Sequence, residues 1–422
     1  MTRIVSGRTA TLAMAILVAG TFAACSGSAT PSPAASAAAA PSAAAQSAPA
    51  AATTPAAPAS PSAAPATPIS IGFFAPETGF AAADGASAYD AAQLAVKDIN
   101  GAGGISGRQI SLVNYDDASD AKQAVTIATK LTTQDQVTAV VSGSYSDQTL
   151  AAAPIFQRAK VPMLAAYAVN PGIPKTGNFI FQQDFNGNVE GAAGAVALIK
   201  DLGATKVAIV SIQNDFGSAL TAGFTKEANA LGATIVATDS NQFGEKSFGP
   251  ILQRDVAKGA TGFFMIEYAA EGQQFISAWN KLGLHLPLVG TEGIDTETEF
   301  LQPVGAAANG MLFVTPFNRD STDPGVQSFI QEFTTAYGHA PDMVAATTYD
   351  SFMLLKASLA GGTSSDQIAA AIAATKGFVG VTGTIQSYNS SGEVVKAVDI
   401  EIIKDGAVHH YGVVDDPAII TP

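Results

Sequence analysis

The sequence predicts an α/β protein with two Rossmann-like lobes, each built on a parallel sheet, and a ligand cleft between the lobes. Two observations predict this architecture. Short apolar runs alternate with segments of helical periodicity from Ile69 onward, and the alternation restarts at Val189. Strands of four to six apolar residues between helices are typical of parallel sheets covered on both faces. Ligands bind beyond the carboxyl ends of such strands, which two lobes can place across a cleft.

The first unit opens with Ile69–Ala75, an apolar run that predicts a strand. Tyr89, Ala92, Val96 and Ile99 follow at helical spacing and would form one buried face. Asn100-Gly101 would end this helix in the left-handed conformation that favours glycine. The other elements predicted in this unit are strands over 110–115, 137–141 and 161–164 and helices over 121–131 and 148–159.

The second unit repeats the same alternation. It begins with a helix over 189–202 and a strand over 206–211. The elements that follow are helices over 218–231, 248–258 and 271–282 and strands over 234–238, 262–266 and 287–290. This repetition predicts a second α/β lobe.

The first residues have the pattern of an exported protein. Arg3 and Arg8 precede Leu12–Gly20, an apolar stretch shorter than the ~20 residues that span a bilayer. The residues up to Cys25 are Phe-Ala-Ala-Cys, which resembles a bacterial lipobox. The sequence therefore predicts a signal peptide over 1–24 and lipidation of Cys25, with an ordinary signal peptide and an unused cysteine as the alternative.

A low-complexity segment follows the cysteine. Residues 26–67 are almost entirely Ala, Ser, Pro, Thr and Gly, and the repeated prolines break helices. Such a segment cannot form a core, so the region 25–68 is predicted to be a lipidated, disordered linker. We expect the protein to be lipid-anchored in the cell membrane on its extracytoplasmic face. A tail without a role is the alternative for the linker.

Composition excludes several classes of function. The net charge is −14 and only 13% of residues are charged, which argues against nucleic acid as a partner. One cysteine and four histidines offer no metal-site spacing. The chain has no G-x-S-x-G motif and no P-loop, and its glycine-rich stretch at 101–104 follows a helix rather than a strand. The sequence thus predicts a monomeric protein that is not an enzyme and uses no cofactor.

Four stretches resemble a known family. They are Ile71–Pro76 with Thr78-Gly79, the run AAQLAVKDINGAGGISG over 91–107, Tyr115-Asp116-Asp117 with 121–124, and Leu288–Gly293. Together they are similar to the type I periplasmic-type binding proteins of the branched-chain amino acid (Leu/Ile/Val) class, over about 69–412. The resemblance implies two lobes joined by three crossovers, the first formed by 69–187 plus 317–385 and the second by 188–316 plus 386–415. It also implies binding of a small amino acid for delivery to an ABC permease.

The resemblance implies which residues bind the carboxylate and the ammonium of an amino acid. Ser146 follows one strand and precedes a helix, where a hydroxyl and the helix N-terminus favour an anion. It matches the family's carboxylate-binding serine, although a plain N-cap is the alternative. Glu292 lies past a strand in a glycine-flanked loop and matches the glutamate that pairs with the ligand ammonium. A solvated loop carboxylate is its alternative.

The same resemblance implies five further ligand-binding residues. Tyr268 and Phe216 match aromatic positions of the second lobe that cover the ligand, and rim packing is their alternative. Tyr167 and Val169 follow the strand at 161–164, where the family uses backbone groups and a threonine; Val169 lacks that hydroxyl. Asp84 stands where the family often has an aromatic residue, and could accept from a polar or cationic ligand side chain or cap the helix beginning near Ala86.

Two other functions stay open from the sequence. The same fold could bind urea, a short amide, or a small aromatic or aliphatic carboxylate, and Ser146 alone in the cleft would favour a simple carboxylate. Alternatively, the protein could be a sensory or adhesive surface lipoprotein.

Overall fold

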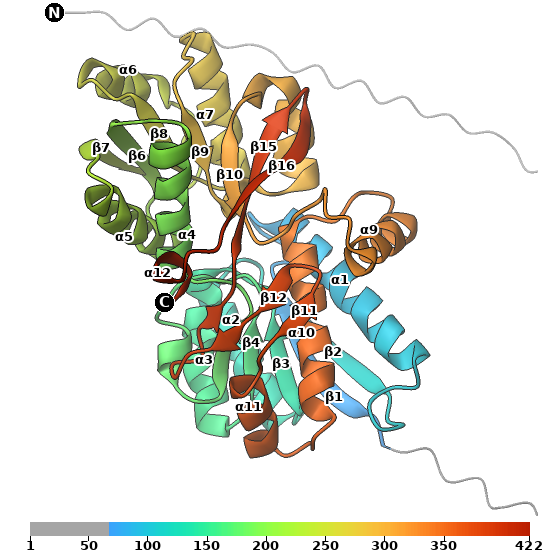
Figure 1. Ribbon diagram of the computed structural model, residues 1–422. Helices are drawn as coiled ribbons and strands as arrows, with labels where there is room; N and C mark the ends of the chain where they lie inside the picture. The colour runs from blue at the N-terminus through green and yellow to red at the C-terminus, as the bar shows by residue number, and fades with distance from the viewer. Residues whose placement is uncertain (1–66) are drawn as a thin grey trace, which may run out of the picture. The chain divides into compact units, whose positions relative to one another are not determined.

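The computed structural model describes residues 67–422 (Figure 1). The predicted signal peptide over 1–24, the lipidation of Cys25 and nearly all of the predicted linker over 25–68 lie outside the described residues. Within 67–422, no helix has both the length and the apolar character needed to cross a membrane.

The first lobe is built on a five-stranded sheet in the order β2-β1-β3-β4-β5. All neighbouring strands in this sheet are parallel, as the sequence predicts. The strands are β1 (Ile69–Ala75), β2 (Ile110–Asp116), β3 (Ala139–Ser142), β4 (Met163–Ala165) and β5 (Ile180–Gln182). The three-residue β5 is not predicted, because three residues are too few to show a periodicity.

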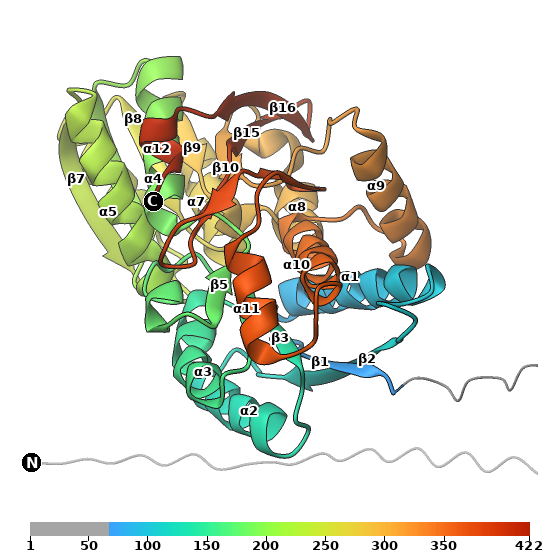
Figure 2. The ribbon, with the colours of Figure 1, turned by 60° about the horizontal axis from the view of Figure 1, so that its bottom comes forward.

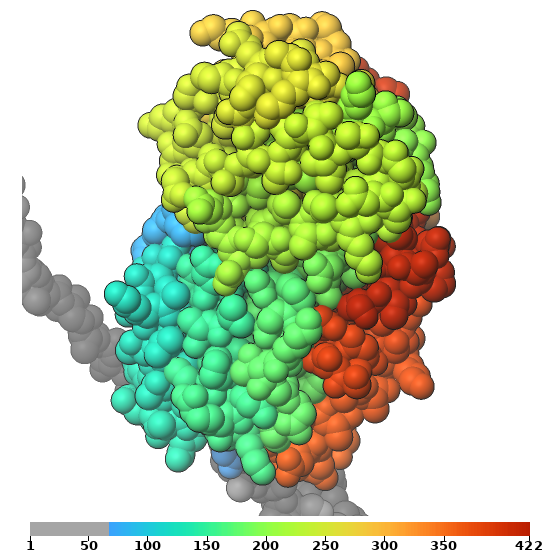
Figure 3. All heavy atoms as spheres, turned by 90° about the vertical axis from the view of Figure 1, so that its left-hand side faces the viewer, coloured from blue at the N-terminus to red at the C-terminus, as the bar shows by residue number. Residues whose placement is uncertain are grey.

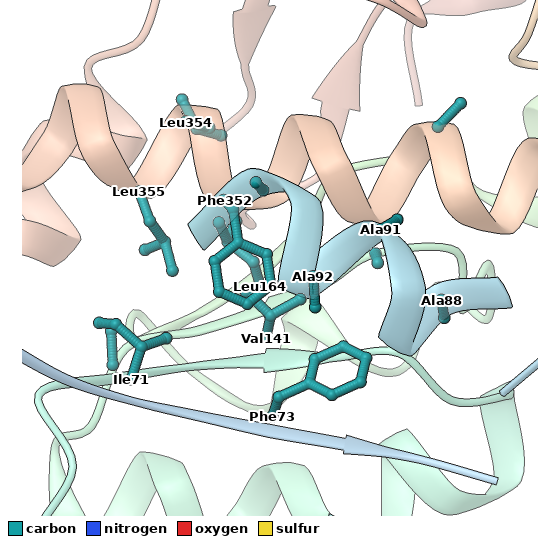
Figure 4. Packing of buried hydrophobic residues seen from close by; sticks show 14 of the residues in the cluster. Ile71, Phe73, Ala88, Ala91, Ala92, Val141, Leu164, Phe352, Leu354 and Leu355 are labelled. Carbon is teal, nitrogen blue, oxygen red and sulfur yellow. The ribbon is translucent and has the colours of Figure 1, made fainter. Parts of the chain in front are cut away.

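Helices cover both faces of this sheet (Figures 1 and 2). Ile71 and Phe73 of β1 pack in one cluster with the buried face of α1 and with Phe352 of α10 (Figure 4). Phe74 belongs instead to the cluster of α2 and α3. This alternation follows from the two-residue period of a strand. The helices are α1 (Ala82–Gly101), α2 (Ala121–Thr133), α3 (Ser146–Ala159), α9 (Pro324–Tyr337), α10 (Met343–Leu359) and α11 (Ser365–Ala373).

The second lobe is built on a seven-stranded sheet in the order β16-β15-β10-β9-β8-β6-β7. Five strands are parallel, namely the four predicted ones and β10, which was not predicted, whereas β15 is antiparallel to both β10 and β16. This hairpin comes from the end of the chain, where a tight turn can join two strands without a crossover helix. The strands are β6 (Lys206–Ile212), β7 (Thr234–Asn241), β8 (Gly262–Ile266), β9 (Leu288–Gly290), β10 (Leu312–Thr315), β15 (Val398–Lys404) and β16 (Ala407–Val414).

The helices of the second lobe also lie on both faces of their sheet. One cluster joins the sheet to α4, α5 and α12, and the other joins it to α6 and α7. A Cβ on Gly191 would stand 2.1 Å from the Leu220 carbonyl oxygen, so only glycine lets α4 and α5 approach this closely. The helices are α4 (Gly187–Ala195, continued as a π-helix over Val196–Asp201), α5 (Asp215–Ala230), α6 (Gly249–Ala257), α7 (Ala269–Lys281) and α12 (Pro417–Ile420).

Two predicted details of α1 are wrong. The helix begins at Ala82 rather than near Ala86, so Asp84 lies within its first turn. The chain leaves the helix through Gly103 (φ 95°) and Gly104 (φ 73°), and not through a left-handed Asn100-Gly101. Gly101 does end the helix, as predicted, but it keeps a helical conformation as the last residue, and the left-handed residues follow Ala102.

The chain passes three times between the two sheets: from β5 to α4, from β10 to α9, and from the last small strands to β15. Two antiparallel pairs precede the third passage, β11 (Phe378–Gly380) with β12 (Gly383–Ile385), and β13 (Ser387–Tyr388) with β14 (Val394–Val395). The two lobes meet directly on the face drawn in Figure 3. The predicted architecture of two α/β lobes is thus confirmed, whereas the residue boundaries of the lobes stay a prediction.

Candidate functional site

A small cavity of about 10 Å³, the room of about one water molecule, lies between the two lobes. Most of the residues that line it follow the carboxyl end of a strand, the place where parallel sheets bind ligands. Six of the seven residues suggested by the sequence meet here. The lining consists of Asp84, Tyr145, Ser146, Tyr167, Phe216, Tyr268, Glu292, Gly293 and Met343.

Ser146 lies at the first position of α3, directly after the loop that follows β3. It is 3% exposed, and its hydroxyl oxygen accepts from the Asn170 N–H at 3.3 Å. The hydroxyl hydrogen is therefore free to be donated into the cavity. Tyr145 provides no side-chain cap for α3, so the N–H groups of the first turn are also available. This corner of the cavity suits an anionic group.

Glu292 begins the short helical turn after β9 and is 2% exposed. Its N–H donates to Glu190 Oε1 at 2.9 Å, and its own Oε2 has no hydrogen-bond partner within residues 67–422. Burial raises the pKa of Glu292 well above its usual value, and the charges of Glu190 and Asp184 add to this effect. A cationic group in the cavity would favour the ionised carboxylate. This corner therefore suits an ammonium.

Aromatic rings form the walls between these two corners. Tyr145 of the first lobe stacks on Tyr268 of the second, with centroids 4.7 Å apart and planes at 2°. Phe216 stacks on the other side of this group, 5.1 Å from Tyr268. The exposed rings of Phe80 and Phe243 extend the cluster to the surface, 4.5 Å apart. Such walls bury apolar ligand surface and exclude water.

Two hydroxyls of these walls bond to the protein itself. The Tyr167 hydroxyl donates to the Gly143 carbonyl, and the Tyr268 hydroxyl accepts from Asn214 Nδ2 at 3.2 Å. These bonds hold both rings in place beside the cavity. Gly293 leaves room for the rings of Phe216 and Tyr268, because a Cβ there would stand 3.2 Å from each of them and 2.7 Å from the Glu267 carbonyl oxygen.

Asp84 is the second carboxylate of the cavity and is 4% exposed. The Tyr145 hydroxyl donates to its Oδ2, whereas no described residue bonds its Oδ1. Burial raises the pKa of Asp84 well above its usual value, the charge of Asp342 raises it further, and the bond from Tyr145 opposes them.

The structure does not bring Val169 to the cavity. Its side chain is fully buried in the core cluster of the second lobe, and its carbonyl accepts from the Gly187 N–H at 2.7 Å. The position of Val169 in the loop after β4 suggested that it lines the cavity. An aliphatic side chain, however, gains more free energy by burial in the adjacent core. Val169 therefore joins the loop to the start of α4.

Sequence reasoning missed Tyr145, Gly293 and Met343. Tyr145 and Gly293 adjoin Ser146 and Glu292 in the same loops, so a search of whole strand-end loops could have found them. Met343 is different, because it begins α10, about two hundred residues along the chain from Ser146. No local pattern places it here; the fold alone does.

The ionisable or hydroxyl-bearing aliphatic side chains of the lining are those of Ser146, Glu292 and Asp84, three tyrosines add phenolic hydroxyls, and none of the lining residues is Lys, Arg or His. Within 67–422, no group of three or more His, Cys, Asp or Glu side chains is arranged to hold a metal ion. The chemistry of the lining suits a small zwitterion, with its anion near Ser146 and its cation near Glu292, and the lobes have to move apart to admit one.

A buried carboxyl group also lies directly before Tyr268. Glu267 is fully buried, and its Oε2 accepts from Asn241 Nδ2 at 3.1 Å. Burial raises the pKa of Glu267 to about 9, and the charges of Glu271 and Glu245 also raise it. Between its ordinary value of 4.5 and about 9, the folded protein keeps a proton that the unfolded chain has lost.

The free energy of unfolding should therefore fall as the pH rises through this window. The variant Glu267→Gln should lose part of this pH dependence and be more stable than the parent at pH 8 by about 1–3 kcal/mol. Denaturant unfolding at pH 5 and pH 8 measures the effect, with the exposed Glu332→Gln as control. Equal pH dependence in parent and variant would show that Glu267 ionises normally.

Comparison with known proteins agrees with this geometry. The sequence model of the family described as periplasmic binding protein matches residues 68–407. An amino acid binding protein from Pseudomonas aeruginosa is 27% identical over 305 residues, which cover 72% of this chain and 81% of that protein. The Leu/Ile/Val-binding protein of Escherichia coli is 25% identical over 295 residues, which cover 70% of this chain and 80% of that protein.

A solved structure is similar over nearly its whole length. The branched-chain amino acid transporter substrate-binding protein LivJ from Streptococcus pneumoniae, in complex with isoleucine, is 29% identical with a TM-score of 0.75. The match covers 82% of this chain and 99% of that one. These relatives are binding proteins of transporters, and this chain likewise is not an enzyme. It belongs to the periplasmic binding protein family, in the type I fold that the branched-chain amino acid-binding members share.

Proposed function

We propose that this protein is the extracytoplasmic substrate-binding lipoprotein of an ABC importer. It binds a small amino acid, branched-chain or related, between its lobes and delivers it as a monomer to the permease. The observation that supports this most is the position of Ser146 and Glu292. They come from opposite lobes and line one small cavity, the first able to donate to a carboxylate and the second able to accept from an ammonium.

The lining of the cavity favours an amino acid over the other ligands considered. A simple aromatic or aliphatic carboxylate would bring a negative charge to a cavity that already holds Asp84 and Glu292 and no cationic side chain. Urea or a short amide would leave the ammonium position beside Glu292 without a charge. A zwitterion satisfies both corners. The names of the relatives, which include an amino acid binding protein and a complex with isoleucine, point the same way.

A thermal-shift screen of the purified full-length chain tests the proposal. The panel holds the twenty L-amino acids, urea, short amides and small carboxylates. A ligand at 100 times its Kd should add about 2.7 kcal/mol to the free energy of unfolding, which is a readable shift. We expect hits among the amino acids. Hits only among carboxylates or amides would overturn the proposed ligand class, and no hit at all would favour a sensory or adhesive lipoprotein.

The lipid anchor needs a test of its own. Replacing Cys25 with alanine removes the only thiol of the chain and should release the protein from the membrane fraction into the soluble fraction. Fractionation of cells that express the parent and the Cys25→Ala variant measures this. The control variant Ser26→Ala alters the neighbouring residue and should stay with the membrane. Membrane attachment of Cys25→Ala would overturn the anchor.

A further inference from the structure

The cavity offers the ligand two unpaired carboxylate oxygens on two different lobes. Glu292 Oε2 belongs to the second lobe and Asp84 Oδ1 to the first, and neither has a hydrogen-bond partner among the described residues. The proposed function uses only Glu292, for the ligand ammonium. Asp84 Oδ1 is left over. A buried acceptor without a donor costs about 1–3 kcal/mol, which a suitable ligand could recover.

Asp84 is built into the cavity rather than merely near it. It is 4% exposed, lies in the first turn of α1, and shares the lining with Tyr145, whose hydroxyl already donates to Oδ2. Gly85 supports this placement, because a Cβ there would stand 2.2 Å from the Pro76 carbonyl oxygen. The close approach of α1 to the loop after β1 holds the carboxyl group inside. Of its two oxygens, only Oδ1 is available to a ligand.

The two carboxyl groups belong to different lobes and have different neighbours. Asp84 lies in the first turn of α1, where the Tyr145 hydroxyl donates to it, and Glu292 begins the turn after β9. In the proposed function the ligand ammonium pairs with Glu292, which leaves the donor for Asp84 to another part of the ligand.

We propose that Asp84 recognises the ligand's side chain, an inference that rests on the proposed amino acid function. It selects an amino acid whose side chain carries a hydrogen-bond donor, namely a hydroxyl, amide or ammonium group, over the aliphatic branched-chain amino acids. The aromatic walls pack against the carbon atoms of that side chain, and its donor meets Oδ1. An aliphatic side chain would leave this oxygen unpaired, and sites with buried polar groups discriminate strongly against ligands that leave them so.

Isothermal titration of the full-length chain with isosteric ligand pairs tests this inference. The pairs are threonine and valine, asparagine and leucine, and ornithine and norleucine. In at least one pair the member with the donor should bind about tenfold or more tightly, equivalent to about 1.4 kcal/mol. The variant Asp84→Leu should lose or reverse this preference. Asp90→Leu, six residues along α1 and outside the cavity lining, should keep it.

Each result separates the two proposals. Stronger binding of the aliphatic member in every pair, or an unchanged donor preference in Asp84→Leu, would overturn the role of Asp84 and leave amino acid binding intact. Absence of binding by every amino acid would overturn both. If Asp84→Leu fails to fold, Asp84→Asn takes its place: its oxygen can accept from the Tyr145 hydroxyl, which leaves an N–H beside the ligand's donor, so this variant should also lose the donor preference. An unchanged preference in Asp84→Asn would overturn the role of Asp84.

Discussion

Replacing Glu292 with glutamine is expected to weaken amino acid binding by roughly thirtyfold or more, which is about 2 kcal/mol. The residue is 2% exposed, and its Oε2 lacks a partner among residues 67–422. A charge-assisted bond in such a buried position is stronger than the same bond in water. Glutamine keeps the shape of the side chain but cannot offer a charge to the ligand ammonium. Calorimetric titration with the best ligand of the screen measures the loss.

Glu297 provides the matched control, because it lies five residues further along the same segment and its Oε1 accepts from Gln302 outside the cavity. Glu297→Gln should leave the affinity unchanged. The Glu292→Gln variant should also remain folded, since removal of a charge relieves the crowding of Glu292 with Glu190 and Asp184. An affinity equal to that of the parent would exclude Glu292 from the ligand contact.

The second large effect concerns stability. Arg319 lies in the passage from β10 to α9 and bonds two fully buried carboxylates, Asp295 and Glu401. Its Nη1 is 3.2 Å from Asp295 Oδ2 and 2.6 Å from Glu401 Oε2. Burial by itself would lower the pKa of Arg319, but the two carboxylates raise it above its usual value, so the guanidinium stays charged. One cation thus joins the crossover to β15 and to the loop after Glu292.

Arg319→Met should destabilise the protein by about 3–5 kcal/mol, because it leaves two buried carboxylates without their cation. Denaturant unfolding measures the change. Arg254→Met removes a half-exposed guanidinium that pairs with Asp239 and Asp255, and it should cost less than about 1 kcal/mol because Lys258 still pairs with the buried Asp255. Neutralising all three members, in Arg319→Met with Asp295→Asn and Glu401→Gln, should recover much of the loss. A small effect of Arg319→Met would mean that water reaches and solvates the two acids.

The elements that could be predicted are those with a long periodic pattern. β1 and β8 have the predicted bounds, and the helices that alternate with the strands through residue 290 lie within a few residues of their predicted ends. The short β5 and the hairpin of β15 and β16 were not predicted. The hairpin alternates exposed and buried residues, and its pairing with β10 is a long-range contact that no window of sequence contains.

Some residues of the candidate site could likewise be predicted from the sequence, and others could not. Ser146, Glu292, Phe216 and Tyr268 each stand just after a predicted strand, and strand ends are where parallel sheets bind ligands, so their positions followed from the pattern and the family resemblance. Val169 stood in a similar place and turned into the core instead. The side chain of a loop residue can point into the cavity or into the adjacent core. Only the packing of the second lobe against this loop determines that the side chain of Val169 lies in the core.

By itself, then, the sequence determined the alternation of strands and helices, the division into two α/β lobes and the strand ends that carry polar side chains. These properties follow from local periodicity and from the chemistry of single residues. The tertiary structure alone decided that Met343 of α10 lines the same cavity as Ser146, that Tyr145 stacks across the lobes on Tyr268, and that Asp84 Oδ1 is left without a partner. Such contacts join residues far apart in the chain, and their geometry exists only once both lobes have packed around the same space.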